Sequence, residues 1–440
     1  MIDSGTTAWM LVCTALVLLM TPGLAFFYGG MTRAKSVLNM MMMSFVSIIV
    51  VTVAWVLYGY SLAFDAVGDG SGFLNKIVGG LDYVGLSGVV NAVYEAASPD
   101  GNFPLMVFSA FQLTFAIITV ALISGAIADR AKFGAWVVFS VVWATVVYFP
   151  VAHWVWGGGW LGQLGIEDFA GGTVVHINAG AAALALALVI GKRKGWRKEP
   201  MRPHNLTLVL LGVGLLWFGW FGFNAGSELA PDQTAALAFM NTQIATAVAA
   251  GAWMIVEKLR DGHATTLGVA SGAVAGLVAI TPACGFVDPW AAALIGLLAG
   301  VGCAYAVGLK YRLGYDDSLD VVGVHLVGGV IGAVALGFVA AYPFADGQEK
   351  GILIPGGQLS QLGLQILGPV VVGLYSFVIS WVIGKAIDKT MGFRIPEEAE
   401  VAGVDATTHA ETGYDLGTVY ASGVSSPNGP AAPAPKKVDA

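Results

Sequence analysis

Charged residues are scarce in this sequence. They account for 11% of its 440 residues, whereas soluble globular domains contain about 25%. Hydrophobic residues account for 57%, and so little charge over such a length excludes a soluble enzyme. The apolar residues lie in continuous runs instead of alternating stretches of about ten residues, which excludes a transmembrane β-barrel. We therefore predict an all-α polytopic membrane protein that is surrounded by the lipid bilayer.

Cysteines and recognisable catalytic patterns are also rare. Cys13, Cys284 and Cys303 lie in apolar stretches, without the spacing of metal ligands. We expect free, buried thiols, no metal and no cofactor. No basic patch suggests a nucleic-acid partner, nothing resembles an ATP-binding loop, and no nucleophile lies at a workable spacing from a base. The sequence therefore predicts that the protein is not an enzyme.

Eleven hydrophobic runs are long enough to be membrane spans. They cover residues 7–29, 40–64, 104–126, 133–151, 169–190, 205–226, 235–256, 266–284, 289–309, 320–342 and 361–387. Lysine and arginine indicate the orientation, because they are enriched in loops on the inner side of the membrane. Of the 21 lysines and arginines, 19 fall on the same side of the predicted spans, and only Lys76 and Lys350 fall on the opposite side. This distribution predicts that the N-terminus is outside and the C-terminus inside.

Two of these runs share a pattern. Asp168 is followed eight residues later by His176 in DFAGGTVVHINAG, and Asp317 is followed eight residues later by His325 in DSLDVVGVHLVGG. They are the fifth and the tenth run, so they occupy equivalent places in two halves of five helices. Because each half crosses the membrane an odd number of times, equivalent helices of the two halves run in opposite directions. We therefore predict an inverted repeat of five plus five helices with a site between the halves, and an eleventh helix as an addition.

His176 and His325 are the two histidines that lie deep in apolar runs. Ionisable residues inside a membrane are costly, so they usually face an interior pathway. A single histidine of this kind is compatible with a satisfied core residue, whereas two at matched positions favour a functional pair. A haem held between facing helices is an alternative interpretation of the pair.

Several long segments resemble the ammonium transporter family (Amt/MEP/Rh) over nearly the whole membrane region. They are FYGGMTRAKSVLN, YGYSLAFD, AHWVWGGG, DFAGGTVVHINAG, GWFGFNAGSELA, SGAVAGLVAITPACGFV, DDSLDVVGVH and GFRIPEEAEVAGVD. The resemblance implies a multi-pass protein of the cell inner (plasma) membrane that forms a homotrimer with one pore in each subunit. It also implies ammonium or ammonia as the substrate, with methylammonium as an analogue. Because Trp156 and Ser227 are both present, the sequence is most similar to the bacterial Amt branch.

The resemblance assigns roles to four residues near the outer end of the pore. The family's recruitment site corresponds to Trp156 and Ser227, where an indole face attracts a cation and a hydroxyl accepts a hydrogen bond. Phe115 and Phe223 correspond to two stacked gating rings, and Phe115 also borders the recruitment site. Without the resemblance, an interfacial aromatic belt is the alternative for Trp156. Ordinary core packing is the alternative for the two phenylalanines.

Three further residues have counterparts in the family. Asp168 matches its essential acid, and its position at the start of the fifth run is also that of a helix N-cap. The resemblance implies that Asp168 stabilises the vestibule and the arriving cation electrostatically. His176 and His325 match the family's twin-histidine motif, and paired imidazoles can relay a proton because each nitrogen can donate or accept.

These residues permit transport by deprotonation. Ammonium is close to potassium in size, so a simple hole would pass both ions, and carrying a charge through an apolar passage is prohibitive. Ammonium, unlike potassium, can lose a proton and cross as neutral ammonia. We expect the released proton to follow through the histidines, which would make transport electrogenic. A passive ammonia gas channel is the alternative.

The chain divides into a transmembrane domain, residues 1–387, and a tail. Residues 388–416 have the charged pattern of the family's ordered cytoplasmic segment. Residues 417–440 are rich in glycine, serine, alanine and proline, which predicts disorder. By resemblance, the cytoplasmic face binds a PII signal protein, and a solvated tail without a partner is the alternative. An ammonium sensor would carry a fused signalling domain after the membrane part, and this tail is too short for one.

Overall fold

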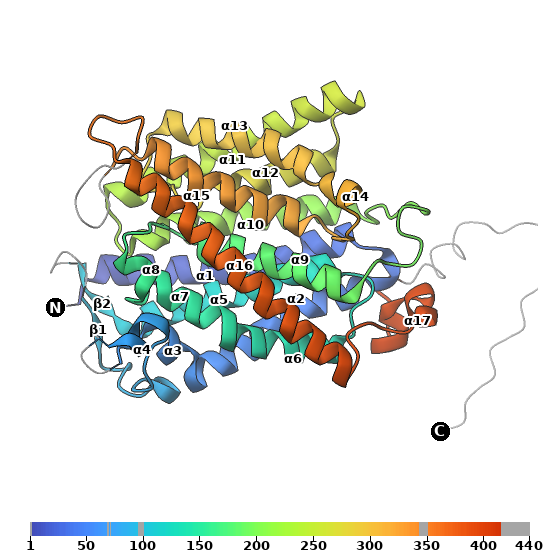
Figure 1. Ribbon diagram of the computed structural model, residues 1–440, viewed down its shortest axis with the longest axis horizontal. Helices are drawn as coiled ribbons and strands as arrows, with labels where there is room; N and C mark the ends of the chain where they lie inside the picture. Colours follow the sequence, from blue (N-terminus) through green and yellow to red (C-terminus); the bar gives the residue numbers. More distant parts are fainter. Residues whose placement is uncertain (1, 68–69, 71, 96–100, 343–350, 415–440) are drawn as a thin grey trace, which may run out of the picture.

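The structure is a computed structural model that describes residues 2–67, 70, 72–95, 101–342 and 351–414. It is mostly helical, and the long helices run side by side along the long axis of the molecule (Figure 1). One end carries the first helix start and two short antiparallel strands, β1 (Val93–Tyr94) and β2 (Phe103–Pro104). The opposite end carries α17 (Glu397–Ala402). We call these the β end and the tail end.

Among the described residues, ten helices are long and apolar enough to cross a membrane. They are α1 (Ser4–Met31); Ala34–Phe64, with α2 (Val37–Ala54) and α3 (Tyr60–Phe64); Leu105–Ile127, with α5 (Leu105–Ile123); Phe133–Gln163, with α6 (Phe133–Trp143), α7 (Phe149–Val155) and α8 (Trp160–Gln163); Gly172–Ile190, with η7 (Gly172–Ile177) and α9 (Asn178–Ile190); Leu206–Glu228, with α10 (Leu206–Ala225); α11 (Gln233–Asp261); Pro289–Leu313, with α13 (Pro289–Ala306) and α14 (Leu309–Leu313); Val322–Val339, with η9 (Val322–Leu326) and α15 (Val327–Val339); and α16 (Leu359–Thr390). The expected polytopic helical fold is thus confirmed, and the three cysteines are free and buried.

The eighth expected span differs from the prediction. The apolar run 266–284 contains α12 (Thr266–Ile280), which has only 15 residues. At 1.5 Å per residue this helix is about 22 Å long, shorter than the hydrocarbon core of about 30 Å. It ends at Ile280 because Pro282 follows and cannot continue the helical hydrogen bonds. The apolar run continues through the next turn, so hydrophobicity alone overestimates the helix.

Two of the contacts between helical segments involve candidate site residues. α1 makes its most extensive contact with α10, and the η7–α9 segment packs against η9–α15. Gly180 and Gly329, each four residues after its histidine, lie at the second contact. A Cβ on Gly180 would lie 2.6 Å from the backbone nitrogen of Leu326, and one on Gly329 would lie 2.9 Å from the side chain of Ile177. Glycine at both positions therefore lets the two segments approach closely.

The last long helix leads to a tail that folds back on the bundle. α16 crosses the face of the molecule diagonally and ends near α17 (Figure 1). Arg394 pairs with Ala131 in an isolated β-bridge, and the turn η10 (Asp405–His409) contacts the start of α2. The segment 388–414 is therefore held against the tail end. The predicted disordered segment, residues 417–440, lies outside the described residues.

Candidate functional site

A cavity of about 260 Å3 opens at the β end, and we call it the β-end cavity. Its lining is largely aromatic. The lining residues are Phe64, Tyr94, Phe108, Gln112, Phe115, Val155, Trp156, Phe169, Ser227 and Leu229. The structure therefore brings together Trp156, Ser227 and Phe115, three of the residues to which the sequence assigns substrate binding. Aromatic faces around a small space provide a favourable environment for a cation.

Hydrogen bonds fix the orientation of Trp156 and Ser227 in this cavity. The indole Nε1 of Trp156 donates to the backbone oxygen of Asp168 at 2.9 Å, and the ring meets Phe115 edge-on at a centroid distance of 6.0 Å. The Ser227 hydroxyl donates to the backbone oxygen of Phe223 at 2.8 Å. Its hydrogen is thus engaged, while an oxygen lone pair remains available to accept a bond from a ligand.

The side chain of Asp168 binds the chain instead of lining this cavity. Its carboxylate accepts the backbone N–H groups of Gly171, Gly172, Thr173 and Val174 at 2.6–3.0 Å. This is the helix cap that its position predicts, extended to four donors. Burial raises the pKa of the Asp168 carboxyl, and the four N–H donors oppose this effect. Asp168 therefore holds the segment that carries His176, and it also holds Trp156 through its backbone oxygen.

Phe115 and Phe223 lie between the β-end cavity and the centre of the bundle. Their rings are stacked, with centroids 4.1 Å apart and planes at 20°. Both side chains are fully or almost fully buried. Phe115 lines the β-end cavity and Phe223 lines the next one, so the stacked pair separates the two spaces.

The second space contains both histidines, and we call it the histidine cavity. Apart from the imidazoles, its lining is apolar or aromatic. The lining residues are Met20, Leu24, Phe27, Ile118, Leu122, His176, Leu216, Trp220, Phe223, Val274 and His325. Its volume is about 10 Å3, roughly the space that one water-sized sphere needs. It is narrow enough to strip the hydration shell from a small ion.

The two imidazoles face each other across this cavity. Nδ1 of His176 lies 3.3 Å from Nδ1 of His325, and the rings are stacked at a centroid distance of 5.3 Å. Nε2 of His176 is buried and has no hydrogen-bond partner in the described part of the chain. Trp220 stacks on His176 at 5.3 Å and is itself held by a hydrogen bond to Thr281 at 2.9 Å. The geometry of the pair is therefore fixed, and Nε2 of His176 is free of hydrogen bonds to the described residues.

The segment before His325 repeats the arrangement around Asp168. Asp317 accepts the backbone N–H groups of Val321 at 3.1 Å and Val322 at 2.7 Å. These donors are four and five residues after the acid, as Gly172 and Thr173 are after Asp168. Burial raises the pKa of the Asp317 carboxyl to about 6, while the ammonium group of Lys310 opposes this shift.

Further cavities continue from the histidines to the tail end. Asp320, Leu319 and Met31 line both a narrow space beside His325 and a larger one of about 300 Å3. The larger space, the tail-end cavity, is also lined by Arg193. The histidine cavity shares Phe27, Val274 and His325 with the narrow space, so these spaces form a series that leads to the tail end. The β-end cavity shares no lining residue with the histidine cavity, and the stacked Phe115 and Phe223 lie between the two. The histidine cavity and the space beside His325 are the narrowest of these spaces, at about 10 Å3 each.

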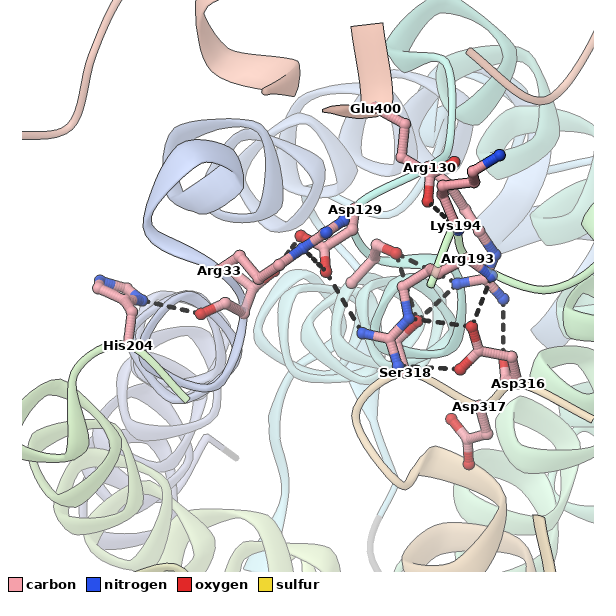
Figure 2. Close-up of polar contacts among 12 residues, drawn as sticks. Arg33, Asp129, Arg130, Arg193, Lys194, His204, Asp316, Asp317, Ser318 and Glu400 are labelled. Carbon is pink, nitrogen blue, oxygen red and sulfur yellow. Dashed lines mark hydrogen bonds and ion pairs between the residues drawn. The ribbon is translucent and has the colours of Figure 1, made fainter. Parts of the chain in front are cut away.

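Buried ion pairs connect the loops around the tail end (Figure 2). Asp129 accepts from Arg33 at 3.0 Å and from Arg193 at 3.3 Å, and Arg193 also pairs with Asp316 at 2.9 Å. Although burial raises the pKa of the Asp129 carboxyl, the two arginines outweigh this effect and hold its pKa below the usual range. No pattern in the sequence pointed to this network.

The tail joins the same network. The carboxylate of Glu400 accepts from the backbone nitrogen of Lys194 and from Arg394, each at 2.6 Å. Asp405 accepts from the backbone nitrogens of Leu38 at 2.9 Å and Asn39 at 2.8 Å. Both acids are buried, and Asp405 acts as a cap for the first turn of α2 from a distant part of the chain.

The sequence of the chain matches a known protein family. A model of the Ammonium Transporter Family matches residues 8–414. An ammonium transporter of Mycobacterium tuberculosis is 54% identical, over 96% of this chain and 92% of the relative. One of Bacillus subtilis is 47% identical, over 93% and 98%.

Solved structures agree with the sequence relatives. The crystal structure of Candida albicans Mep2 superposes with a TM-score of 0.82 and 35% identity, covering 90% of this chain and 87% of Mep2. A protein described as a sensor Amt protein superposes with a TM-score of 0.83 and 27% identity, covering 92% and 98%. The family match spans the β-end cavity, both histidines and the folded-back tail. The chain therefore belongs to the ammonium transporter family.

Proposed function

We propose that this protein recruits ammonium at Trp156, Ser227 and Phe115, removes a proton from it, and conducts ammonia through the histidine cavity. The proton would pass through His176 and His325, which makes net transport electrogenic. The observation that carries the proposal is the hydrogen-bond contact of the two imidazoles inside an apolar constriction. Such a site suits a neutral molecule and a separately handled proton.

Recruitment rests on two kinds of attraction. The faces of Trp156 and Phe115 attract a cation electrostatically, and the Ser227 oxygen accepts one of its N–H groups. Asp168 contributes its negative charge from behind the cavity wall and keeps the Trp156 ring in place. These residues favour an ammonium ion over a neutral molecule at the cavity, before any proton is lost.

Selectivity follows from the narrow space beyond the Phe115–Phe223 stack. A cation that enters the histidine cavity loses its hydration shell. The apolar lining of the cavity replaces little of the lost hydration free energy. Ammonium avoids this cost by leaving its proton behind, whereas potassium cannot. Movement of the two stacked rings would admit ammonia and then separate the cavities again, so that Phe115 and Phe223 act as a gate.

The relay depends on proton positions in the histidine pair. A neutral imidazole has one N–H donor and one acceptor nitrogen. At 3.3 Å, Nδ1 of one ring donates to Nδ1 of the other, so the two outward Nε2 atoms are one acceptor and one donor. The pair can therefore take a proton at one end and release one at the other. The same short distance leaves no room for a haem iron between the facing nitrogens, which disfavours the haem interpretation.

Two other functions make different predictions. A passive ammonia gas channel would use the same cavity without moving charge, and the histidines would only line it. An ammonium sensor is suggested by the likeness to the sensor Amt protein. The sensor Amt protein is 27% identical to this chain in sequence. The M. tuberculosis and B. subtilis relatives named as transporters are 54% and 47% identical to it. We therefore favour transport.

The predicted topology belongs to the same proposal. The first helix, α1, begins at the β end, and α17 lies at the tail end (Figure 1), so the chain between them makes an odd number of crossings. Ten long spans are an even number, so we propose that the shorter, buried α12 and the turn after it together make the eleventh crossing. The matched acid caps, π-helical turns and glycines of the two histidine segments support the inverted five-plus-five repeat. With the N-terminus outside, the β-end cavity opens to the exterior of the plasma membrane.

The family resemblance supports a proposal for assembly and regulation. We propose a homotrimer in the plasma membrane, with a transmembrane domain of residues 1–387 and a cytoplasmic segment of residues 388–416. The exposed tail end, with its cavity and ordered segment, would be the surface that a PII signal protein covers. Mixing purified protein with a PII protein and measuring co-elution tests the partner.

Reconstitution tests the central proposal. Purified protein in liposomes should give a current when ammonium is added, and a weaker one with methylammonium. Potassium at the same concentration should give none. Ammonium-dependent alkalinisation without current would favour the gas channel, and the absence of any flux would favour a sensor.

A further inference from the structure

Gln112 is a polar residue in the β-end cavity that has no role in the proposed recruitment site. It lies in α5, one turn before Phe115, and the residue is 9% exposed. Its Oε1 atom is buried and has no hydrogen-bond partner within the described residues. A buried amide oxygen without a partner is unfavourable. The position therefore calls for a donor that the described chain does not supply.

The other residues of the cavity show which donor would fit. The aromatic faces of Trp156, Phe115 and their neighbours attract a positive charge but accept no directed hydrogen bond of ordinary strength. Ser227 offers a single acceptor oxygen. Ammonium carries four N–H donors, so a second acceptor is needed to replace part of its hydration shell. Gln112 provides that acceptor in the same cavity.

Resting on the proposed function, we infer that the Gln112 amide oxygen accepts a hydrogen bond from the recruited cation. Rotation of the amide by 180° exchanges its oxygen and nitrogen, so the oxygen can turn toward the cavity when a cation arrives. Gln112 and Ser227 then hold two N–H groups of the ion between the aromatic rings. Gln112 is in this sense a residue that sets the affinity for cations with N–H donors.

The inference concerns binding and not the later steps. Gln112 lines the β-end cavity and does not line the histidine cavity. Loss of its oxygen should therefore weaken recruitment and leave the passage of ammonia intact. If Gln112 had a purely structural role, its replacement would lower the stability or the maximal rate of transport. The apparent KM for ammonium would not change specifically.

Three variants in liposomes test this inference. Gln112→Leu removes the amide at similar size, Gln112→Glu keeps an acceptor oxygen, and Gln233→Leu makes the same change at an exposed position of α11. Initial currents over a range of ammonium concentrations give the apparent KM and the maximal rate. Gln112→Leu should raise the apparent KM at least about tenfold, equivalent to about 1.4 kcal/mol. Its maximal rate should stay within about twofold.

The controls make the outcome decisive. Gln112→Glu should retain an apparent KM near the wild-type value, and Gln233→Leu should match the wild type in both constants. An unchanged KM in Gln112→Leu, or an equal rise in Gln112→Leu and Gln112→Glu, would overturn the inference. Absence of an ammonium current from wild-type protein would instead refute the proposed function, so the two failures are distinguishable.

Discussion

Nδ1 of His176 and Nδ1 of His325 lie 3.3 Å apart and face each other. Two nitrogens at this distance share one hydrogen, so protonation of one ring fixes which nitrogens of the other ring can donate. The two residues thus act as a unit, although they are 149 positions apart. Changing one histidine should alter the chemistry of both.

Acidic replacement of one histidine should weaken potassium exclusion. In His176→Asp or His325→Glu, a carboxylate would offset part of the desolvation cost of a cation, which a neutral imidazole does much less. We expect both variants to carry potassium current, whereas His176→Ala and His325→Ala mainly lose ammonium current. Currents in liposomes with either cation measure this. Single variants that keep full ammonium current and full potassium exclusion would move the filter to the Phe115–Phe223 stack.

Asp168→Ala should abolish transport and destabilise the protein. It leaves four buried N–H groups of residues 171–174 without their acceptor, and loss of a helix cap alone costs about 0.5–2 kcal/mol. Asp168→Glu should keep partial activity, because the longer side chain displaces the carboxylate. Uptake of labelled methylammonium and thermal unfolding in detergent measure the two effects.

A second helix cap provides the control for this experiment. Asp232 accepts from the backbone nitrogen of Ala235 at the start of α11, at an exposed position. Asp232→Ala should lower stability by about 1 kcal/mol and leave uptake unchanged. Normal uptake by a folded Asp168→Ala protein would show that Asp168 is a replaceable cap only.

The membrane spans were predictable because bilayer thickness imposes a minimum length on each apolar run. α12 was the exception, since Pro282 ends a helix without interrupting the hydrophobicity. The facing histidines were also predictable, because the repeated spacing from Asp168 and Asp317 placed them at equivalent positions. Trp220 and Gln112 were not, because a single aromatic or amide residue in an apolar helix has no periodic pattern to reveal its neighbours.

The ion pairs at the tail end show a second limit of sequence reasoning. Arg193 is separated from Asp129 by 64 positions and from Asp316 by 123. All three lie in connections between helices with other charges nearby, where the positive charge indicates only which side of the membrane a loop occupies. Which carboxylate meets which arginine depends on how the helices pack, and this information is not local.

Asp129→Asn should destabilise the tail end strongly. Breaking a buried ion pair costs about 3–5 kcal/mol, since the remaining charge keeps its desolvation penalty. The folded-state pKa of Asp129 lies below its ordinary value of 3.8, so the stability it contributes is present above that pH and is lost as the pH falls toward the folded pKa. The difference in unfolding temperature between wild type and variant should therefore be constant from pH 5 to pH 8.

An exposed pair supplies the comparison for Asp129. Arg260 and Asp261 form an ion pair at 2.7 Å with side chains 38% and 49% exposed. Asp261→Asn should change stability by about 0–1 kcal/mol. Equal effects of the two substitutions would mean that the Asp129 pairs are screened as effectively as surface charges.

Asp405→Ala should release the tail from the bundle. The carboxylate caps the first turn of α2 through Leu38 and Asn39, and removing such a cap costs about 0.5–2 kcal/mol. That cost falls on a short segment that is otherwise held by Glu400, by backbone bonds and by side-chain contacts such as Lys35 with the Val401 oxygen and His204 with Tyr414. It therefore affects local docking more than global unfolding. Limited trypsin digestion should cut the variant after Arg394 severalfold faster than the wild type.

Glu398→Ala is the matched control, because Glu398 is an exposed acid of the same segment, and it should be cut at the wild-type rate. Equal protection of Asp405→Ala and wild type would show that the remaining contacts, among them Glu400 and the bridge between Ala131 and Arg394, suffice to hold the tail.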